Sequence, residues 1–476
     1  MGRGVVSRLV AVSNRVAGPK RARTAGGLTV GVLAALRKHG GMWFGWSGKT
    51  LERNDGEVQL VSSGGVDFAT IDINKQDCDA YYNGFSNNTL WPLFHSLLGF
   101  FSYNRTEYDA YRRVNELFAR RLASLLTPDD VIWVHDYHLL FLAFELRRIG
   151  VTQPIGFFLH VPFPGFDVLR ALPGHDEILK ALAAYDVVGV QTRRDLRALH
   201  DCFKQPEVGG AVRKGSVEAF GRRFFTEAFP IGIDVDECRS LAEKNLEHPR
   251  VQRLANRLGR RKLMIGIDRL DYSKGLLLRF RAVESLLDNY PETRGEVVFM
   301  QIAPPTRAGV RTYQEIRHEL ERAAGNINGH HTDIDWVPIR YLNRAYDRGV
   351  VMALMRTARV GLVTPIRDGM NLVAKEYLAS QNADDPGVLV LSRLCGAAEE
   401  LKLSILINPY DQRAVADGIA TALKMPLEER RERHRTMFAV LARDDVHRWS
   451  RRFIEALHGV RAQATPAAST IRRKRR

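Results

Sequence analysis

Two cations stand close together in the stretch RLDYSKG, residues 269–275. The stretch follows the apolar run KLMIGID and precedes apolar residues with helical spacing. At the carboxyl end of a parallel strand, the first turn of the next helix offers unpaired N–H groups to an anion. Arg269 can grip a phosphate in a bidentate contact, and Lys274 can add a mobile point charge. The pair predicts a clamp for a diphosphate, although Asp271 could equally neutralise Arg269 in a solvated loop.

A second junction between strand and helix lies in RVGLVTPIRDGMNLVAKEYLASQ, residues 359–381. An Asp-Gly-Met-Asn turn leads into the predicted helix, whose first amides belong to Asn371, Leu372 and Val373. Glu376 follows one turn later, where its carboxylate can accept hydrogen bonds from ribose hydroxyls. A glutamate near a helix N-terminus is also favoured by the helix dipole alone, so this residue does not decide the function by itself.

Two glycines open the first predicted helix, in TAGGLTVGVLAALRKHG. Gly26 and Gly27 would allow the backbone to approach an anion closely, but a pair of glycines is also typical of a tight turn. The glycines therefore support an anion site only together with the other two junctions.

Histidines gather at two further strand ends. His135, Asp136 and His138 follow one predicted strand in WVHDYHLL, and His160 ends the next in FFLHVPFP. No pair among them has the i, i+4 spacing of a zinc-binding helix. We therefore predict no metal here, since Asp136 with a neutral histidine can equally bind sugar hydroxyls.

The elements that must position these residues alternate between short β-branched runs and helical patterns along the chain. The predicted strands of the first half are RLVAVS, VIWVH, PIGFFLHV and VVGVQ, and those of the second half are KLMIGI, GEVVFMQIA, DWVPIRYL, RVGLVTP and GVLVLS. This alternation predicts an α/β protein with helix-covered parallel sheets, in two doubly wound lobes that meet near residue 235. Residues 204–222 are interpreted as a loop with uncertain strand content.

Composition narrows the class of protein. A chain of 476 residues fits two large domains, and its formal charge of +16 suggests anionic partners such as nucleic acid, headgroups or phosphorylated metabolites. Four widely spaced cysteines argue against a disulfide framework, and no apolar run has the length of a signal core or membrane span. We expect a cytoplasmic protein.

Eight motifs resemble those of a known family when they are taken in order: VSNRVA, AGGL, WFGWSG, YYNGFSNNTLWP, HDYHLL, FFLHVPFP, RLDYSKG and RDGMNLVAKEY. The chain is similar from about residue 8 to residue 460 to the trehalose-6-phosphate synthases, retaining enzymes that join UDP-glucose to glucose 6-phosphate. The resemblance implies the GT-B fold, two Rossmann-like lobes with the active site between them.

The resemblance also implies the site residues. The donor set is Gly26, Gly27, Arg269, Lys274, Tyr346, Asp368, Leu372, Val373, Ala374, Lys375 and Glu376. The acceptor set is Arg15, Trp43, Tyr82, Trp91, Asp136 and Arg307. Arg269, Lys274, Asp136 and His160 would act in catalysis, with Asp368 and His160 contacting the transferred glucose. No cofactor or metal is implied, since the two cations would stabilise the leaving diphosphate during front-face attack.

The implied organisation assigns residues 1–234 to an acceptor lobe and residues 235–460 to a donor lobe, with a last helix able to pack back on the first lobe. Residues 461–476 would be a disordered basic tail, and the chain would form a dimer or tetramer without nucleic acid or membrane partners.

Several alternatives remain open in the sequence. The base of the donor nucleotide could be uracil, adenine or guanine. The chain could also be a related synthase that uses glycerol 3-phosphate as its acceptor, or a pseudo-glycosyltransferase. A Rossmann dehydrogenase lacks its G-x-G-x-x-G fingerprint here and would leave the clamp without a role. A nucleic-acid-binding protein would explain the charge but not the aromatic residues beside glycine-rich turns.

Overall fold

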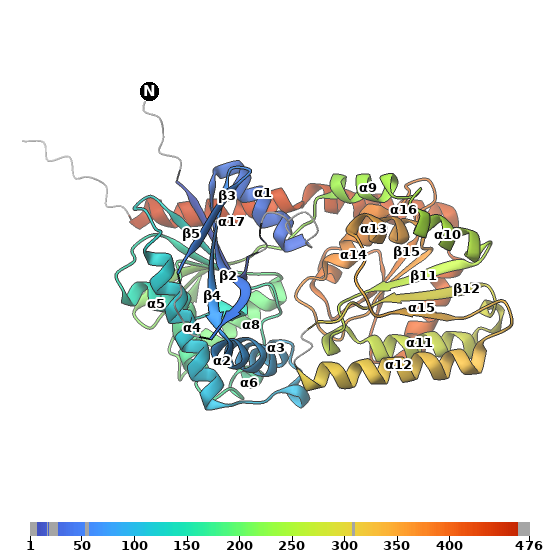
Figure 1. Cartoon of the computed structure of the whole chain (residues 1–476), viewed down its shortest axis with the longest axis horizontal. Helices are drawn as coiled ribbons and strands as arrows, with labels where there is room; N and C mark the ends of the chain where they lie inside the picture. Colours follow the sequence, from blue (N-terminus) through green and yellow to red (C-terminus); the bar gives the residue numbers. More distant parts are fainter. Residues whose placement is uncertain (1–6, 17, 19–26, 53–56, 307–309, 465–476) are drawn as a thin grey trace, which may run out of the picture.

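The computed structural model describes residues 7–16, 18, 27–52, 57–306 and 310–464, and these form two α/β lobes side by side (Figure 1). The first lobe holds a ten-stranded sheet in the order β3-β4-β2-β1-β5-β6-β7-β10-β9-β8. Its strands are β1 (Leu9–Arg15), β2 (Gly41–Leu51), β3 (Gln59–Ser63), β4 (Val66–Asn74), β5 (Val131–His135), β6 (Ile155–Phe158), β7 (Val187–Val190), β8 (Ala211–Arg213), β9 (Ser216–Ala219) and β10 (Arg222–Ala228). Pairing is parallel from β4 to β10 and antiparallel at both edges.

The second lobe holds a six-stranded, wholly parallel sheet in the order β13-β12-β11-β14-β15-β16. Its strands are β11 (Lys262–Ile267), β12 (Val297–Ile302), β13 (Ile339–Leu342), β14 (Val360–Val363), β15 (Val388–Ser392) and β16 (Ile405–Ile407). Buried runs of β-branched and aliphatic residues form these strands, as parallel sheets covered on both faces require. The predicted α/β class with two parallel sheets is confirmed.

Helices cover both sheets. In the first lobe they are α1 (Gly27–His39), α2 (Lys75–Cys78), the π-helix η1 (Asp79–Leu90), α3 (Trp91–Phe94), η2 (Leu98–Phe100), α4 (Arg105–Ala123), η3 (Tyr137–Leu139), α5 (Leu142–Arg148), α6 (Phe166–Leu169), α7 (His175–Leu182) and α8 (Arg193–Phe203). In the second they are α9 (Val235–Lys244), α10 (Pro249–Leu258), η4 (Tyr272–Lys274), α11 (Leu276–Asn289), η5 (Pro291–Thr293), α12 (Arg311–His331), α13 (Arg348–Thr357), α14 (Leu372–Ser380), η6 (Gly396–Glu399), α15 (Gln412–Lys424) and α16 (Leu427–Arg443). Among the described helices, none is long and apolar enough to cross a membrane.

The segment expected as a loop, residues 204–222, instead contains β8, β9 and the start of β10. Two tight turns join these strands, and each has a left-handed residue followed by a glycine: Lys214 (φ 43°) with Gly215 (φ 82°), and Phe220 (φ 52°) with Gly221 (φ 71°). Strands this short give little periodicity in the sequence, which is why the pattern indicated a loop.

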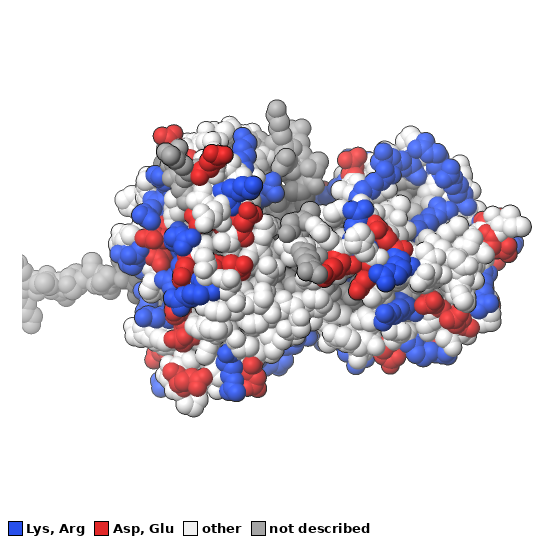
Figure 2. All heavy atoms as spheres, turned by 60° about the horizontal axis from the view of Figure 1, so that its bottom comes forward, with Lys and Arg blue, Asp and Glu red and all other residues white. Residues whose placement is uncertain are grey.

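The last helix, α17 (Val446–Ala464), leaves the second lobe and packs on the first. The rings of Trp449 and Phe453 lie 4.9 and 4.8 Å from the ring of Trp133 on β5. The division of the chain after residue 234 stays a prediction. The predicted disordered tail, residues 461–476, overlaps the end of α17, which continues to Ala464. The disorder of residues 465–476, which lie outside the described part, stays a prediction. Figure 2 shows acidic and basic side chains interspersed on the first lobe and an arc of Lys and Arg along the upper edge of the second.

Candidate active site

A cavity of about 490 Å³ lies between the lobes, where strands of both sheets end. Its lining residues follow β6, β7 and β10 of the first lobe and β11 and β14 of the second, and helix α1 adds one more. They are Thr29, His160, Gln191, Ile231, Asp268, Arg269, Lys274, Asp368, Met370, Asn371, Leu372, Val373 and Glu376. The structure therefore brings together three of the junctions that the sequence singled out.

The stretch that opened the sequence analysis forms one turn between β11 and α11. Gly275 ends this turn with a φ of 64°, and a Cβ there would lie 2.8 Å from the carbonyl oxygen of Thr364, so only glycine fits without strain. The turn presents Arg269 and Lys274 to the cavity, where Lys274 forms an ion pair with Asp368. Asp271 accepts a hydrogen bond from the Ser273 amide at 3.0 Å.

The N-terminus of α14 forms another part of the cavity wall. Asn371 adopts a left-handed conformation (φ 73°), and its side-chain oxygen accepts a hydrogen bond from the Ala374 amide at 3.2 Å. Leu372, Val373 and Glu376 reach the cavity. Burial raises the pKa of Glu376, while Arg348, with a nitrogen 3.5 Å from its carboxylate, opposes the shift.

Two donor candidates direct their side chains elsewhere. The Lys375 ammonium donates to the carbonyl of Ile231 at 2.7 Å and pairs with Glu400 at 2.6 Å, which ties α14 to the chain crossing between the lobes. Tyr346 is not among the lining residues, and its ring lies 5.0 Å from the guanidinium of Arg344. Only the backbone of Lys375 remains available to a nucleotide.

The histidines at the ends of β5 and β6 face each other. Nδ1 of His135 lies 3.2 Å from Nε2 of His160, and burial lowers the pKa of both rings, that of His160 to about 3. Asp136 has a φ of 75° and accepts a hydrogen bond from the His160 amide at 3.2 Å. A non-glycine residue held in this conformation marks a candidate functional position.

A neutral His160 can exchange hydrogen bonds with sugar hydroxyls but carries no charge at neutral pH. Among the described residues, no group of three or more His, Cys, Asp or Glu is arranged to hold a metal ion. The absence of a metal requirement stays a prediction.

A line of aromatic rings begins at Arg15, at the end of β1. The guanidinium of Arg15 lies 5.7 Å from the ring of Trp46, whose ring lies 5.9 Å from that of Tyr82. Tyr82 in turn stacks on His138, with ring centroids 5.8 Å apart. These residues come from β1, β2, η1 and η3, so four separate elements contribute to one cluster of packed rings.

The same line continues to the donor clamp. Tyr137 lies 4.0 Å from the ring of His138 and 5.7 Å from that of Trp91. The guanidinium of Arg269, from the second lobe, lies 5.6 Å from the Trp91 ring. Aromatic faces flanked by cations suit a phosphorylated sugar, because rings pack on its C–H face while guanidinium groups bind its phosphate.

Trp43 takes no part in this line and is removed from the acceptor set. Its ring is buried in the core on the other face of β2, where Nε1 donates to the Ser13 hydroxyl at 2.9 Å. Side chains alternate between the faces of a strand, so Trp43 and Trp46 point to opposite sides. Alternation along WFGWSG was the signal that could have selected Trp46.

Two further candidates, Gly26 and Arg307, lie outside the described residues. Gly27 is the first residue of α1, and Thr29 of the same helix lines the cavity. The first of the two glycines and the second acceptor arginine therefore stay predictions.

Two lobes built on largely parallel sheets, with a cavity between them that Arg269 and Lys274 line, define a glycosyltransferase with the GT-B fold. The chain belongs to glycosyltransferase family 20, whose model matches residues 8–459.

Relatives of known activity cover nearly the whole chain. The trehalose-6-phosphate synthase of Klebsiella pneumoniae is 47% identical over 96% of each protein. The solved structure of a UDP-forming α,α-trehalose-phosphate synthase from Burkholderia vietnamiensis superposes with a TM-score of 0.95 at 50% identity, covering 97% of this chain and 99% of that one. A homologue from Burkholderia xenovorans, solved in complex with glucose 6-phosphate, has a TM-score of 0.92 at 48% identity, covering 95% of this chain and all of that one.

Proposed function

We propose that this glycosyltransferase transfers glucose from UDP-glucose to glucose 6-phosphate with retention, giving α,α-trehalose 6-phosphate and UDP. The observation that carries the proposal is the line of rings and cations that runs from Arg15 to the diphosphate clamp. We infer that the acceptor binds along this line, because the line begins with a cation suited to a phosphate and ends at Arg269 of the clamp. The relatives' UDP-forming activity and bound glucose 6-phosphate support the same reaction.

The donor side positions UDP-glucose by charge and by backbone amides. Arg269 and Lys274 hold the diphosphate, and the N-terminus of α14 receives the nucleotide with Glu376 near its ribose. Before the donor binds, Lys274 is paired with Asp368. Burial favours a raised pKa for Asp368, but Lys274 and hydrogen bonds outweigh it and hold the pKa below its usual value, so the group is an anion that can accept hydrogen bonds from glucose hydroxyls.

Transfer then occurs on one face of the sugar. The bond between the anomeric carbon and the diphosphate oxygen breaks, and the acceptor hydroxyl bonds to the same carbon from the same side. The departing phosphate oxygen takes the hydroxyl proton, while Arg269 and Lys274 stabilise the charge that develops on it. Asp136 and neutral His160 orient the transferred glucose and the acceptor from the first lobe.

Product analysis tests this proposal directly. Purified protein is given UDP-, ADP- or GDP-glucose together with glucose 6-phosphate, glycerol 3-phosphate or glucose, and products are identified by NMR. We expect an α,α-linked disaccharide phosphate with UDP-glucose and glucose 6-phosphate as the preferred pair. Preferred use of glycerol 3-phosphate, or no transfer to any acceptor, would contradict the proposal.

Two companion proposals accompany the reaction. We expect activity to survive EDTA, because two cations and helix N-termini already face the leaving group. A loss of activity in EDTA that one divalent ion restores would contradict this.

We also propose a dimer or tetramer in solution, which analytical ultracentrifugation of the full chain would test.

A further inference from the structure

The two lobes are joined by chain at one side of the cavity. The chain passes from the first lobe to the second before α9 and returns before α17, and the two crossings touch. The amide of Val446 donates to the carbonyl of Ile233 at 3.2 Å, and Gly232 lies so close to the backbone of residues 444–445 that a Cβ would be 2.3 Å away. In Figure 1 these crossings lie at the top, between α17 and α9.

A second junction between the lobes involves side chains alone. Phe100, on the short turn η2 of the first lobe, stacks flat on Tyr272 of η4, with ring centroids 4.3 Å apart and planes 9° from parallel. The ring of Tyr313, near the start of α12, lies 5.5 Å from Tyr272 on the second lobe. Figure 1 shows this region at the bottom, where the loop before α4 meets α12.

The same two segments also meet at the proposed active site. Nε1 of Trp91 donates to Asp271 at 3.3 Å, and the guanidinium of Arg269 lies over the Trp91 ring. Three contacts therefore join residues 91–100 of the first lobe to residues 269–274 of the second: one ring stack, one hydrogen bond and one contact between a guanidinium and a ring. Trp91, the ring proposed to contact the acceptor, lies on the same segment as Phe100. The clamp residues Arg269 and Lys274 lie on the same segment as Tyr272.

We propose that Phe100 and Tyr272 form a latch between the lobes that positions Trp91 against the Arg269 turn for transfer. The inference rests on the proposed function and assigns both residues a positioning role, since neither lines the donor cavity. The latch lies across the cavity from the chain crossings, so opening of the cleft about those crossings would separate the two rings.

The latch should affect the two substrates unequally. Most of the proposed UDP contacts, those from Arg269, Lys274 and the N-terminus of α14, lie on the second lobe. Trp91 lies on the first lobe and the stack aligns it with the clamp. A stacked aromatic pair stabilises an arrangement by an amount that corresponds to about a two- to tenfold change in population.

The test compares two neighbouring side chains on η2. Phe100 is 43% exposed and Leu98 is 45% exposed, so truncation of either to alanine removes a similarly solvated apolar group. We expect Phe100→Ala to lower kcat/KM for glucose 6-phosphate about two- to tenfold, with the UDP affinity in calorimetry changed less than about twofold. Leu98→Ala should match wild type in both measurements. Phe100→Tyr keeps a flat ring and should restore kcat/KM.

Each outcome decides one question. If wild type forms trehalose 6-phosphate but Phe100→Ala equals Leu98→Ala, the latch is overturned while the proposed function stands. If Phe100→Ala weakens UDP binding as much as it lowers kcat/KM, the stack supports the donor site generally and the positioning role is wrong. If wild type itself forms no such product, the proposed function fails first. Unchanged thermal midpoints establish that the variants are folded.

Discussion

The clamp makes the strongest residue-scale prediction. Arg269→Ala and Lys274→Ala should each weaken UDP binding by at least about tenfold, since a charge-assisted contact contributes about 1.5 to 3 kcal/mol. Loss of Lys274 also leaves Asp368 buried without its ion pair, so Lys274→Ala should bind UDP more weakly than Arg269→Ala does. Calorimetry with UDP measures both.

A matched control for the clamp lies on the next helix. Arg281 is exposed on α11 and outside the cavity lining, so Arg281→Ala removes one positive charge without touching the site. Its UDP affinity should equal that of wild type. Equal weakening in all three variants would mean that general charge attraction, not the clamp, binds the nucleotide.

The buried His95 predicts how the free energy of unfolding changes as the pH falls. Burial lowers the pKa of His95 to about 4, although Asp271 and a hydrogen bond to the Trp91 carbonyl favour its charged form. Between about pH 6.5 and pH 4 the unfolded chain therefore binds more protons at this group, and the free energy of unfolding falls as pH falls. Protonation of this one group should make the free energy of unfolding about 2 kcal/mol lower at about pH 5 than at pH 7.

His95→Asn isolates that contribution. The asparagine amide can donate to the Trp91 carbonyl as Nδ1 does, but it does not titrate. Urea unfolding at pH 7 and pH 5 should show a smaller loss of stability in the variant than in wild type. An identical pH dependence would mean that His95 does not carry the effect.

At the residue scale, the sequence grouped the residues proposed for the donor better than those proposed for the acceptor. Arg269, Lys274, Asp368, Leu372, Val373 and Glu376 all line one cavity, because residues at carboxyl ends of parallel strands share an edge. The described residues proposed for the acceptor lie on separate elements of the first lobe, among them β1 and η1, and no local period in the sequence predicts that they meet. The contact of Phe100 with Tyr272 emerges only from the tertiary structure.

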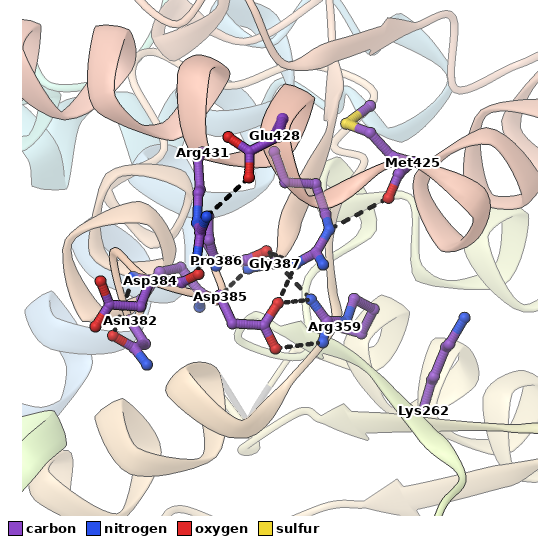
Figure 3. Close-up of polar contacts among 12 residues, drawn as sticks. Lys262, Arg359, Asn382, Asp384, Asp385, Pro386, Gly387, Met425, Glu428 and Arg431 are labelled. Carbon is purple, nitrogen blue, oxygen red and sulfur yellow. Dashed lines mark hydrogen bonds and ion pairs between the residues drawn. The ribbon is translucent and has the colours of Figure 1, made fainter.

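At the element scale, one ionic cluster fastens a loop of the second lobe. Asp385 accepts two hydrogen bonds from Arg359, each 2.9 Å long, and one from Arg430 at 2.5 Å (Figure 3). Arg430 also donates to the carbonyl of Pro386. The cluster joins the loop after α14 to the start of β14 and to α16. Hydrogen bonds to both arginines hold the pKa of Asp385 well below its usual value.

Asp385→Asn should therefore lower stability without changing the site. The carboxylate is about half exposed, so solvent screens the cluster, and we expect a loss of about 1 kcal/mol in urea unfolding at pH 7. Because the folded pKa is lowered, the contribution is present above the unfolded pKa near 4 and is lost as pH falls below it. UDP affinity should stay unchanged.

The neighbouring Asp384 supplies the control. It is also exposed, and Arg431 contacts its backbone carbonyl, which substitution of the side chain leaves in place. Asp384→Asn removes the same charge and should cost much less. Equal losses would assign the effect to net charge and not to the cluster.

Elements with strong periods were predicted with nearly correct bounds, and irregular ones were not. KLMIGI and VIWVH form β11 and β5 at the positions expected. The meander of β8, β9 and β10 was interpreted as a loop because its strands are too short to give a clear period. The π-helix η1, which carries Tyr82, has no simple sequence signature and lay inside a motif known only by resemblance.

At the scale of the whole molecule, the last helix completes the core of the first lobe. Phe453 of α17 fits against Gly156 and Gly189 on neighbouring strands, where a Cβ would lie 2.7 and 2.8 Å from its ring. Trp449 and Phe453 are both nearly fully buried. The first lobe therefore depends on a segment that follows the entire second lobe, and its core is complete only after the chain has crossed between the lobes twice.

Two truncations test this dependence. A chain ended at Ala464 keeps α17 and should retain turnover and thermal midpoint, as the sequence predicts for a dispensable tail. A chain ended at Arg443 lacks α17 and exposes the sheet face that Trp449 and Phe453 cover, so it should not yield folded protein. Phe453→Ala is the milder probe and should cost about 3 to 5 kcal/mol in urea unfolding. Wild-type stability in this variant, or folded protein from the shorter chain, would show that the first lobe stands without the returning helix.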